Sequence, residues 1–131
     1  MRAMLAEDRR VDCAWLFGSV ARGEAGPLSD VDVAVLLAAT VPPEARMDTA
    51  AALVEELERR CGRVDLVLLD EASPALRHRV LRDGLLLVER DARRRVAFET
   101  RSIQEYLDFK PLADIYDRAL IARAREGRLG R

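Results

Sequence analysis

The fold is decided by one stretch of the sequence, Phe17-Gly-Ser-Val-Ala-Arg-Gly-Glu-Ala-Gly-Pro-Leu-Ser-Asp-Val-Asp32. It joins an apolar strand that ends at Phe17 to a second apolar strand that begins at Val31. A Gly-Ser turn at such a junction lets the backbone approach a ligand closely, and a helix that opens at Ser19 directs free N–H groups toward an anion. We therefore expect Gly18 and Ser19 to bind a phosphate group.

Two aspartates, Asp30 and Asp32, occupy alternate positions at the start of the second strand. Alternation places both carboxylates on one face of the strand, roughly 7 Å apart. The opposite face carries Val31, Val33 and Val35, which we expect to be buried. The spacing suits two carboxylates that share a pair of divalent cations about 4 Å apart.

A third carboxylate, Asp65, is an isolated charge near the start of the apolar strand expected at 63–69. Burying a lone carboxylate is costly unless a cation or a hydrogen-bond donor compensates it. If this strand lies beside the one that carries Asp30 and Asp32, Asp65 joins them across the sheet. Three carboxylates beside a phosphate-binding turn indicate metal-assisted phosphoryl or nucleotidyl transfer.

Apolar periodicity and turn residues predict the remaining elements. Pro74, preceded by Ser73, begins one helix, Gly62 ends another, and Pro111 must kink the C-terminal helical run or restart it as a new helix. We expect strands at 13–17, 31–37, 63–69 and 85–88, and helices at 2–10, 19–22, 43–61, 74–81 and from 91 onward. This order predicts an α+β (mixed α/β) fold with a small mixed β-sheet and flanking helices.

The quoted stretch resembles the DNA polymerase β-type nucleotidyltransferase superfamily, and within it the minimal nucleotidyltransferases (MNT) that act as antitoxins of HEPN toxins. The similarity continues through Val64-Asp-Leu-Val-Leu-Leu-Asp70 and through Asp83-Gly84 with the apolar Leu85-Leu-Leu-Val88. It covers about residues 10–90, whereas residues 91–131 resemble the helical tail of the family only in a general way.

The resemblance implies a polymerase β-like nucleotidyltransferase fold, with a core at 1–90 and a helical extension at 91–131 packed on the same domain. It also implies ATP as substrate and two Mg²⁺ ions. Gly18 and Ser19 would receive the triphosphate. Asp30 and Asp32 would hold one ion on the triphosphate and share a second, whose shell Asp65 would complete while helping to remove the proton of the acceptor hydroxyl.

Two further residues are candidates for nucleotide binding. Arg22 is expected to contact phosphate, although a surface pairing with Glu24 is an alternative. Ser29 is expected to steady the loop before the aspartates, the alternative being a plain turn or cap residue.

Charge and composition restrict the function classes. The 131-residue chain carries 22 basic and 23 acidic residues, so no global field attracts it to nucleic acid, and we expect no direct nucleic-acid binding. No apolar run approaches the ~20 residues of a membrane span, and the N-terminus lacks an apolar signal core, so we expect a cytoplasmic protein. Cys13 and Cys61 are expected to be reduced core residues, and His78, the only histidine, a surface helical residue.

The apolar residues after position 91 have two interpretations. They pack on the sheet as core, which we favour from the sequence, or they form an exposed stripe that docks another protein. The resemblance raises the second possibility, because MNT antitoxins bind helical toxins.

Three functions remain open. The first is an antitoxin that transfers AMP to a tyrosine of a HEPN toxin. The second is a nucleotidyltransferase acting on a small molecule such as an aminoglycoside, with a helical partner subunit. The third is an antitoxin without activity that blocks its toxin by binding.

Overall fold

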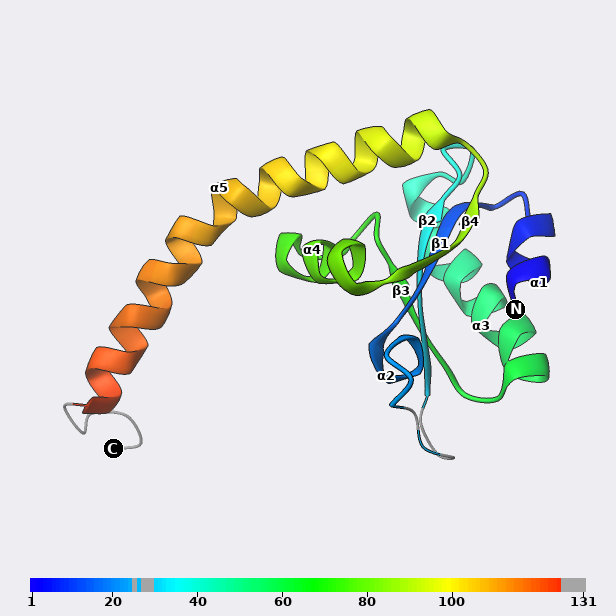
Figure 1. The fold of residues 1–131 in the computed structure, drawn as a ribbon. Helices are drawn as coiled ribbons and strands as arrows, with labels where there is room; N and C mark the ends of the chain where they lie inside the picture. The colour runs from blue at the N-terminus through cyan, green and yellow to red at the C-terminus, as the bar shows by residue number, and fades with distance from the viewer. Residues whose placement is uncertain (25, 27–29, 126–131) are drawn as a thin grey trace.

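Four strands form a mixed sheet in the order β3-β2-β1-β4, so that β1 and β2 lie at its centre (Figure 1). β1 pairs antiparallel with β2 and with β4, whereas β2 and β3 are parallel. The computed structural model describes residues 1–24, 26 and 30–125. The strands are β1 (Val11–Phe17), β2 (Val31–Leu37), β3 (Val64–Leu68) and β4 (Leu85–Glu89). The expected mixed sheet is confirmed.

Helices flank both faces of this sheet (Figure 1). They are α1 (Arg2–Glu7), α2 (Gly18–Ala21), a 3₁₀ turn η1 (Pro43–Ala45), α3 (Arg46–Cys61), α4 (Pro74–Asp83) and α5 (Ala92–Arg125). α1 and α3 cover one face, and α4 with the first turns of α5 covers the other. Among the residues that the structure describes, no helix combines the length and apolarity needed to cross a membrane.

Strand alternation divides the core into two layers. On one face of the sheet, Val33 and Val35 of β2 belong to a cluster that includes Leu53 and Leu57 of α3. On the other face, the intervening β2 residues join Val80 of α4 and Phe98 of α5. The alternation expected for this strand is therefore confirmed, and the aspartate that precedes Val33 faces the α4 layer.

Local sequence signals end α3 and begin α4 where they were expected, whereas α4 continues to Asp83, beyond the expected end at position 81. α3 ends at Gly62, whose φ of 76° is a left-handed conformation that favours glycine. α4 begins after Ser73, whose hydroxyl accepts a hydrogen bond from the Leu76 amide at 3.2 Å. Gly84 follows the last residue of α4, and its amide donates to the carbonyl oxygen of Val80 at 2.7 Å. A Cβ atom at this position would overlap that oxygen, so the close approach requires glycine.

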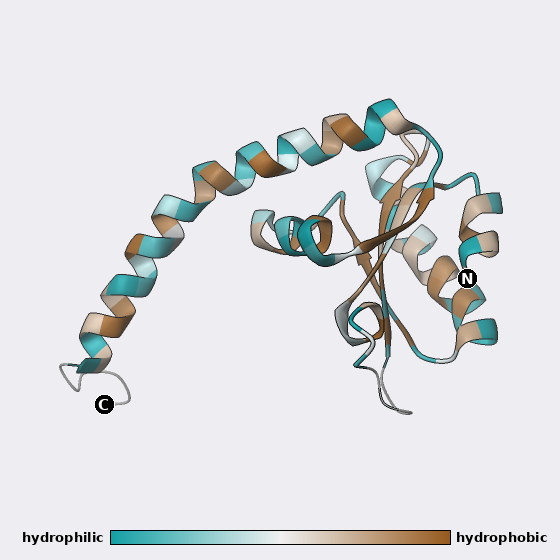
Figure 2. Cartoon of the chain, in the orientation of Figure 1, coloured by the Kyte–Doolittle hydropathy of each residue, from teal (hydrophilic) through white to brown (hydrophobic). Residues whose placement is uncertain are grey.

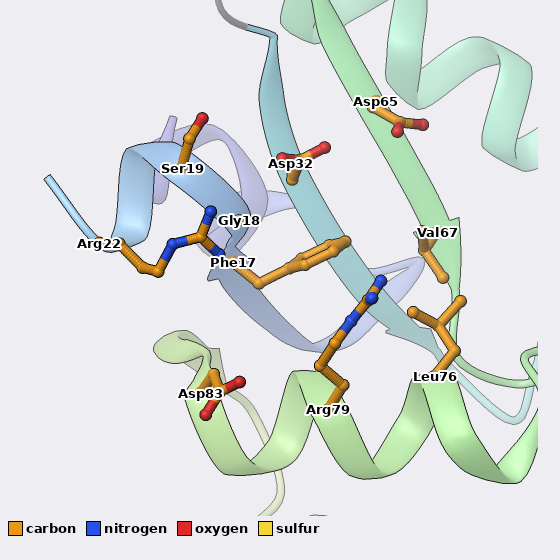
Figure 3. Close-up of a pocket in the computed structure, with 10 residues that line it drawn as sticks. All are labelled: Phe17, Gly18, Ser19, Arg22, Asp32, Asp65, Val67, Leu76, Arg79 and Asp83. Atoms are coloured by element: carbon orange, nitrogen blue, oxygen red, sulfur yellow. The ribbon is translucent and has the colours of Figure 1, made fainter. Parts of the chain in front are cut away.

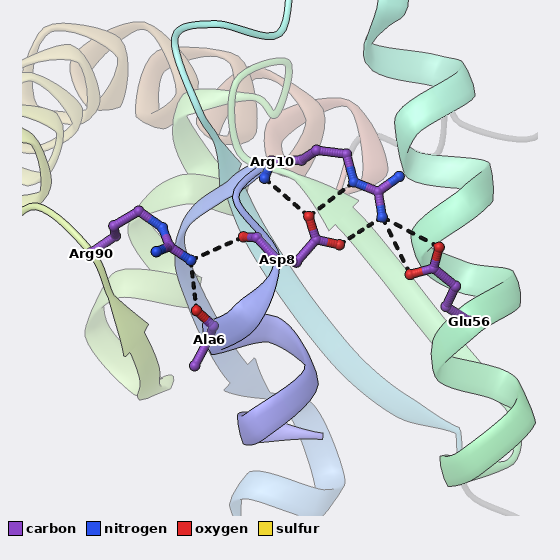
Figure 4. Close-up of polar contacts among 5 residues, drawn as sticks. All are labelled: Ala6, Asp8, Arg10, Glu56 and Arg90. Atoms are coloured by element: carbon purple, nitrogen blue, oxygen red, sulfur yellow. Dashed lines mark hydrogen bonds and ion pairs between the residues drawn. The ribbon is translucent and has the colours of Figure 1, made fainter.

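A polar cluster ties the N-terminal segment to the rest of the molecule (Figure 4). Arg10 bonds the Asp8 carboxylate through two nitrogens, at 2.9 and 2.6 Å, and reaches Glu56 of α3 at 3.2 Å. These hydrogen bonds lower the pKa of Asp8 below its ordinary value. Arg90, just after β4, donates to the carbonyl oxygens of Ala6 and Asp8. Arg10 thereby holds the turn between α1 and β1 to α3, and Arg90 holds it to the end of β4.

The long helix α5 departs from expectation in two respects. It runs through Pro111 without ending there, so of the two outcomes expected at Pro111, a kink or a restart as a new helix, the restart is wrong. Phe98 and Ser102 are buried, but most of the apolar side chains beyond them are exposed, and the helix reaches away from the sheet (Figures 1 and 2). The expectation that the whole apolar stripe packs on the sheet is therefore wrong for Ile103, Leu107, Leu112, Ile115, Tyr116 and Ile121, which are 50–69 % exposed.

The two cysteines are free thiols in contrasting surroundings. Cys13 of β1 is fully buried, and burial raises its pKa to about 11, whereas Cys61 at the end of α3 is half-buried. At pH 8 a thiol with such a pKa is ionised in only about one molecule in a thousand.

We expect a thiol reagent such as DTNB to label Cys61 in the native protein and Cys13 only after unfolding. A Cys61→Ala variant that still reacts rapidly when folded would contradict this burial.

Candidate functional site

The phosphate-binding turn predicted at Gly18 lies between β1 and α2. Gly18 has a φ of 74°, a conformation that favours glycine. Its missing side chain is required for a second reason, since a Cβ atom there would overlap the carboxylate of Asp32. Ser19, the second residue of α2, is half-buried and lines the same cavity as Gly18. The turn therefore places the backbone of Gly18 directly beside the carboxylate of Asp32.

Asp32 and Asp65 are direct neighbours across the parallel pair β2–β3. Partners in register point to the same face of a sheet, so both carboxylates lie in the α4 layer. Burial is the largest cause of a raised pKa at Asp32, and the charge of Asp65 together with a side-chain hydrogen bond between the two carboxyl groups raises it further. Two predicted site residues are thus brought together in a mutually repulsive arrangement that a cation would relieve.

Asp30 lies just before β2 and is exposed. Its charge still raises the pKa of Asp32, but its side chain does not line the cavity that contains Asp32 and Asp65. The strand ladder begins at Val31, so strand alternation does not fix the position of the Asp30 side chain.

The donor chemistry of the site fits the expected Mg²⁺ in part. Carboxylate oxygens are preferred ligands of this ion, and the repulsion between Asp32 and Asp65 disfavours leaving them uncompensated. In the part of the chain that the structure describes, however, no three His, Cys, Asp or Glu side chains form a group that could hold a metal ion. The predicted convergence of all three carboxylates is therefore not seen in this conformation, where Asp30 stands apart.

The remaining candidate residues differ in outcome. Arg22 lines the cavity, but its Nε donates to the Glu24 carboxylate at 3.1 Å, so the surface pairing is the one observed. Ser29 lies outside the described residues.

The cavity has a volume of about 550 Å³, within the roughly 300–1,000 Å³ typical of small-molecule sites. Figure 3 shows that α2 and the ends of β2 and β3 form one wall and that α4 forms the other. One wall contributes the turn and the paired aspartates. The α4 wall contributes Leu76, Arg79 and Asp83.

Arg79 is a site residue that the sequence analysis missed. Its side chain extends from α4 toward β2 and β3 (Figure 3), and it makes no hydrogen bond or ion pair with any residue that the structure describes. The available signal was the spacing of Leu76, Arg79 and Asp83, at i, i+3 and i+7, which places all three on one helix face. Only the docking of α4 shows that this face lines the cavity.

The sequence matches the model of one protein family, described as polymerase beta, nucleotidyltransferase, over residues 1–93. This chain belongs to that family. The predicted polymerase β-like fold and nucleotidyltransferase class are thereby confirmed. No curated protein matches the sequence closely enough to be counted as a relative.

Solved structures of toxin–antitoxin complexes are similar to this nucleotidyltransferase. A chain of a toxin–antitoxin crystal structure with AMP-PNP is 30 % identical, with a TM-score of 0.68 over 90 % of this chain and 94 % of that one. A chain of the MntA-HepT toxin–antitoxin is 28 % identical, with a TM-score of 0.58 over 87 % of each chain. A structure of tri-AMPylated Shewanella oneidensis HEPN toxin in complex with MNT antitoxin gives 25 % identity and a TM-score of 0.60 over 92 % and 99 %. The resemblance to MNT antitoxins is thereby confirmed.

Substitution of Gly18 by alanine tests the close approach between the turn and Asp32. Gly18→Ala adds both backbone strain, on the order of 1–3 kcal/mol, and an overlap that displaces the carboxylate. Gly23→Ala is a matched control, because Gly23 has a φ of 71° but nothing within 4 Å of its Cβ position. We expect both variants to melt at a lower temperature and only Gly18→Ala to lose nucleotidyl transfer. Equal activity in the two variants would show that the overlap does not matter.

Proposed function

We propose that this nucleotidyltransferase is an antitoxin that transfers AMP from ATP to a hydroxyl group, a tyrosine, of a HEPN toxin and so neutralises it. The observation that carries the proposal is the cavity lined by Gly18, Asp32 and Asp65, in which Gly18 closely approaches Asp32 and Asp32 lies beside Asp65. It is supported by the similarity to a toxin–antitoxin with AMP-PNP and to a complex of an MNT antitoxin with a tri-AMPylated HEPN toxin.

In the reaction, the acceptor oxygen forms a bond to the α-phosphorus of ATP. At the same time, the bond between that phosphorus and the oxygen that bridges the α- and β-phosphates breaks. Diphosphate leaves, and the hydroxyl proton is released. The Gly18–Ser19 turn would position the triphosphate through its backbone N–H groups and the Ser19 hydroxyl. Asp65 would assist removal of the proton from the acceptor.

Asp32 and Asp65, joined by Asp30 once a nucleotide is bound, are the residues that would hold Mg²⁺. When bound, the two ions supply charge stabilisation to the entering and leaving oxygens. The repulsion between Asp32 and Asp65 supports this assignment, because two neighbouring carboxylates on a partly buried surface are stabilised by a divalent cation.

The acceptor is most simply presented by a second chain. Beyond Ser102, α5 exposes many large apolar side chains, and this favours a partner protein that covers them. A helical partner subunit is common to both functions, and the similarity to a complex with a tri-AMPylated HEPN toxin favours a protein acceptor over an aminoglycoside.

Intact-mass measurement of a co-expressed partner toxin tests transfer directly. With ATP and Mg²⁺, we expect the partner to gain the mass of one or more AMP groups, and Asp32→Asn to abolish the gain. The variant removes a repulsive charge, so its melting temperature should equal or exceed that of the wild type. An unmodified toxin in a stable complex would instead favour neutralisation by binding, and the absence of a complex would favour a small-molecule acceptor.

Arg79 is expected to bind the triphosphate, since it is a cation in the cavity that makes no hydrogen bond or ion pair with the described residues, although its charge helps to lower the pKa of Asp83. Loss of one charge-assisted hydrogen bond costs about 1.5–3 kcal/mol, so Arg79→Gln should raise the KM for ATP by roughly 10- to 100-fold. Arg22→Gln is the matched comparison and should have a smaller effect, because Arg22 is paired with Glu24. The assignment fails if Arg22→Gln is the more damaging substitution.

A further inference from the structure

A second cavity, of about 280 Å³, lies at the opposite end of β2 and β3 from the paired aspartates. Leu36 of β2 lines it, four residues beyond Asp32, which corresponds to roughly 13 Å along the strand. The two cavities share no lining residue. Four arginines and a single carboxylate supply its polar lining: Arg46 from α3, Arg77 from α4, Arg94 and Arg101 from α5, and Asp70.

Arg77 is fully engaged within the protein. Its Nε and Nη2 donate to the carbonyl oxygens of Leu69 and Asp70 at 2.8 and 2.9 Å, and its Nη1 bonds Glu105 at 2.9 Å. This arginine therefore fixes the end of β3 to α4 and α5 and shapes the wall of the cavity.

Arg94 is engaged on one side only. Its Nη1 bonds the Asp12 carboxylate and the Leu37 carbonyl oxygen. Its Nη2 is 4.0 Å from the nearest oxygen of Asp70, longer than the 2.7–2.9 Å of a charge-assisted hydrogen bond. The Asp70 carboxylate itself accepts a hydrogen bond from the Leu37 amide at 3.0 Å. Arg94 thus keeps donor capacity on its second nitrogen.

The side chains of Arg46 and Arg101 make no hydrogen bond to any residue that the structure describes. The nitrogens of Arg46 are 4.0 Å from Asp70 and 3.7 Å from Glu71, both beyond hydrogen-bond distance. Arg101 lies over the ring of Phe98, 5.7 Å from its centroid, and forms no ion pair in the described chain. Their guanidinium donors are therefore available.

We propose that this second cavity binds a small phosphate anion, inorganic phosphate or diphosphate, between Arg46 and Arg101 with a further contact from Arg94. A guanidinium group presents a planar fork of donors that matches phosphate oxygens. The volume lies just below the usual range for drug-sized ligands, which suits an anion of this size. Asp70 opposes the binding, but it is the only carboxylate in the lining. The carboxylates of Asp12, Glu71 and Glu105 contact these arginines without lining the cavity.

Titration with sodium diphosphate in the presence of EDTA tests this site. Without metal, the paired aspartates of the first cavity repel the anion. We expect diphosphate to raise the melting temperature and to shift the NMR signals of the Arg46 and Arg101 Nε–H groups. Arg46→Gln and Arg101→Gln should each weaken binding about tenfold, the effect of one charge-assisted hydrogen bond. Arg59→Gln, at an exposed arginine of α3, should leave the affinity unchanged.

Several results would overturn the proposal. One is an equal stabilisation by sodium chloride at matched ionic strength, which would indicate a general salt effect. Another is unchanged affinity in Arg101→Gln, which is the decisive variant if Arg46→Gln fails to fold, because Arg101 is exposed and forms no hydrogen bond. Loss of binding in Arg79→Gln, with retention in Arg101→Gln, would place the anion in the first cavity. The proposal does not depend on the acceptor or the toxin.

Discussion

The parallel pairing of β2 with β3 places the Asp32 carboxylate directly beside that of Asp65, and the chemistry of the molecule depends on this contact. Two like charges at such a separation are unfavourable, and partial burial makes Asp32 still harder to ionise. The sheet sustains the contact because the next residues of both strands, such as Val33 and Leu66, pack against the opposite layer. Burial of that apolar layer fixes the strand register, and the register fixes the carboxylates. The repulsion that remains is relieved only by a proton or a cation, and this is the physical basis of the proposed metal site.

The same contact determines the backbone that precedes it. Asp32 is the register partner of Phe17, and the chain turns at the next residue, where only glycine leaves room for the carboxylate. The turn that exposes N–H groups to phosphate and the residue that would hold the metal are therefore parts of one packing arrangement. This explains why Gly18 is needed both for its left-handed φ and for its lack of a side chain.

Local signals were sufficient to predict most of the elements. The bounds of β2 follow from its alternating valines, and those of α4 from Ser73, Pro74 and Gly84. The sequence also identified Asp32 and Asp65, because an isolated carboxylate in an apolar strand requires an explanation. It could not indicate that Asp65 pairs with Asp32 while Asp30 stands apart, since strand register is set by packing across the sheet. The position of Arg79 in the cavity could not be predicted for the same reason. Helical spacing shows which residues share a face of a helix, but it does not show what that face contacts. Apolar periodicity likewise failed for α5, since it does not distinguish a buried stripe from an exposed one.

The exposed part of α5 bears on how the proposed partner and the nucleotide are connected. Helices derive most of their stability from packing, so a long helix whose apolar residues beyond Ser102 face solvent gains most from a second protein. The first turns of α5 pack on α4, where Phe98 joins Val80 in one core layer. The neighbouring residue, Arg79, lies on the side of α4 that lines the cavity with Asp32 and Asp65. A partner docked on α5 near Ile103 would therefore be separated from the proposed nucleotide site by α4. Since packed layers transmit displacement, docking would bear on the position of Arg79 as well as on delivery of the acceptor hydroxyl.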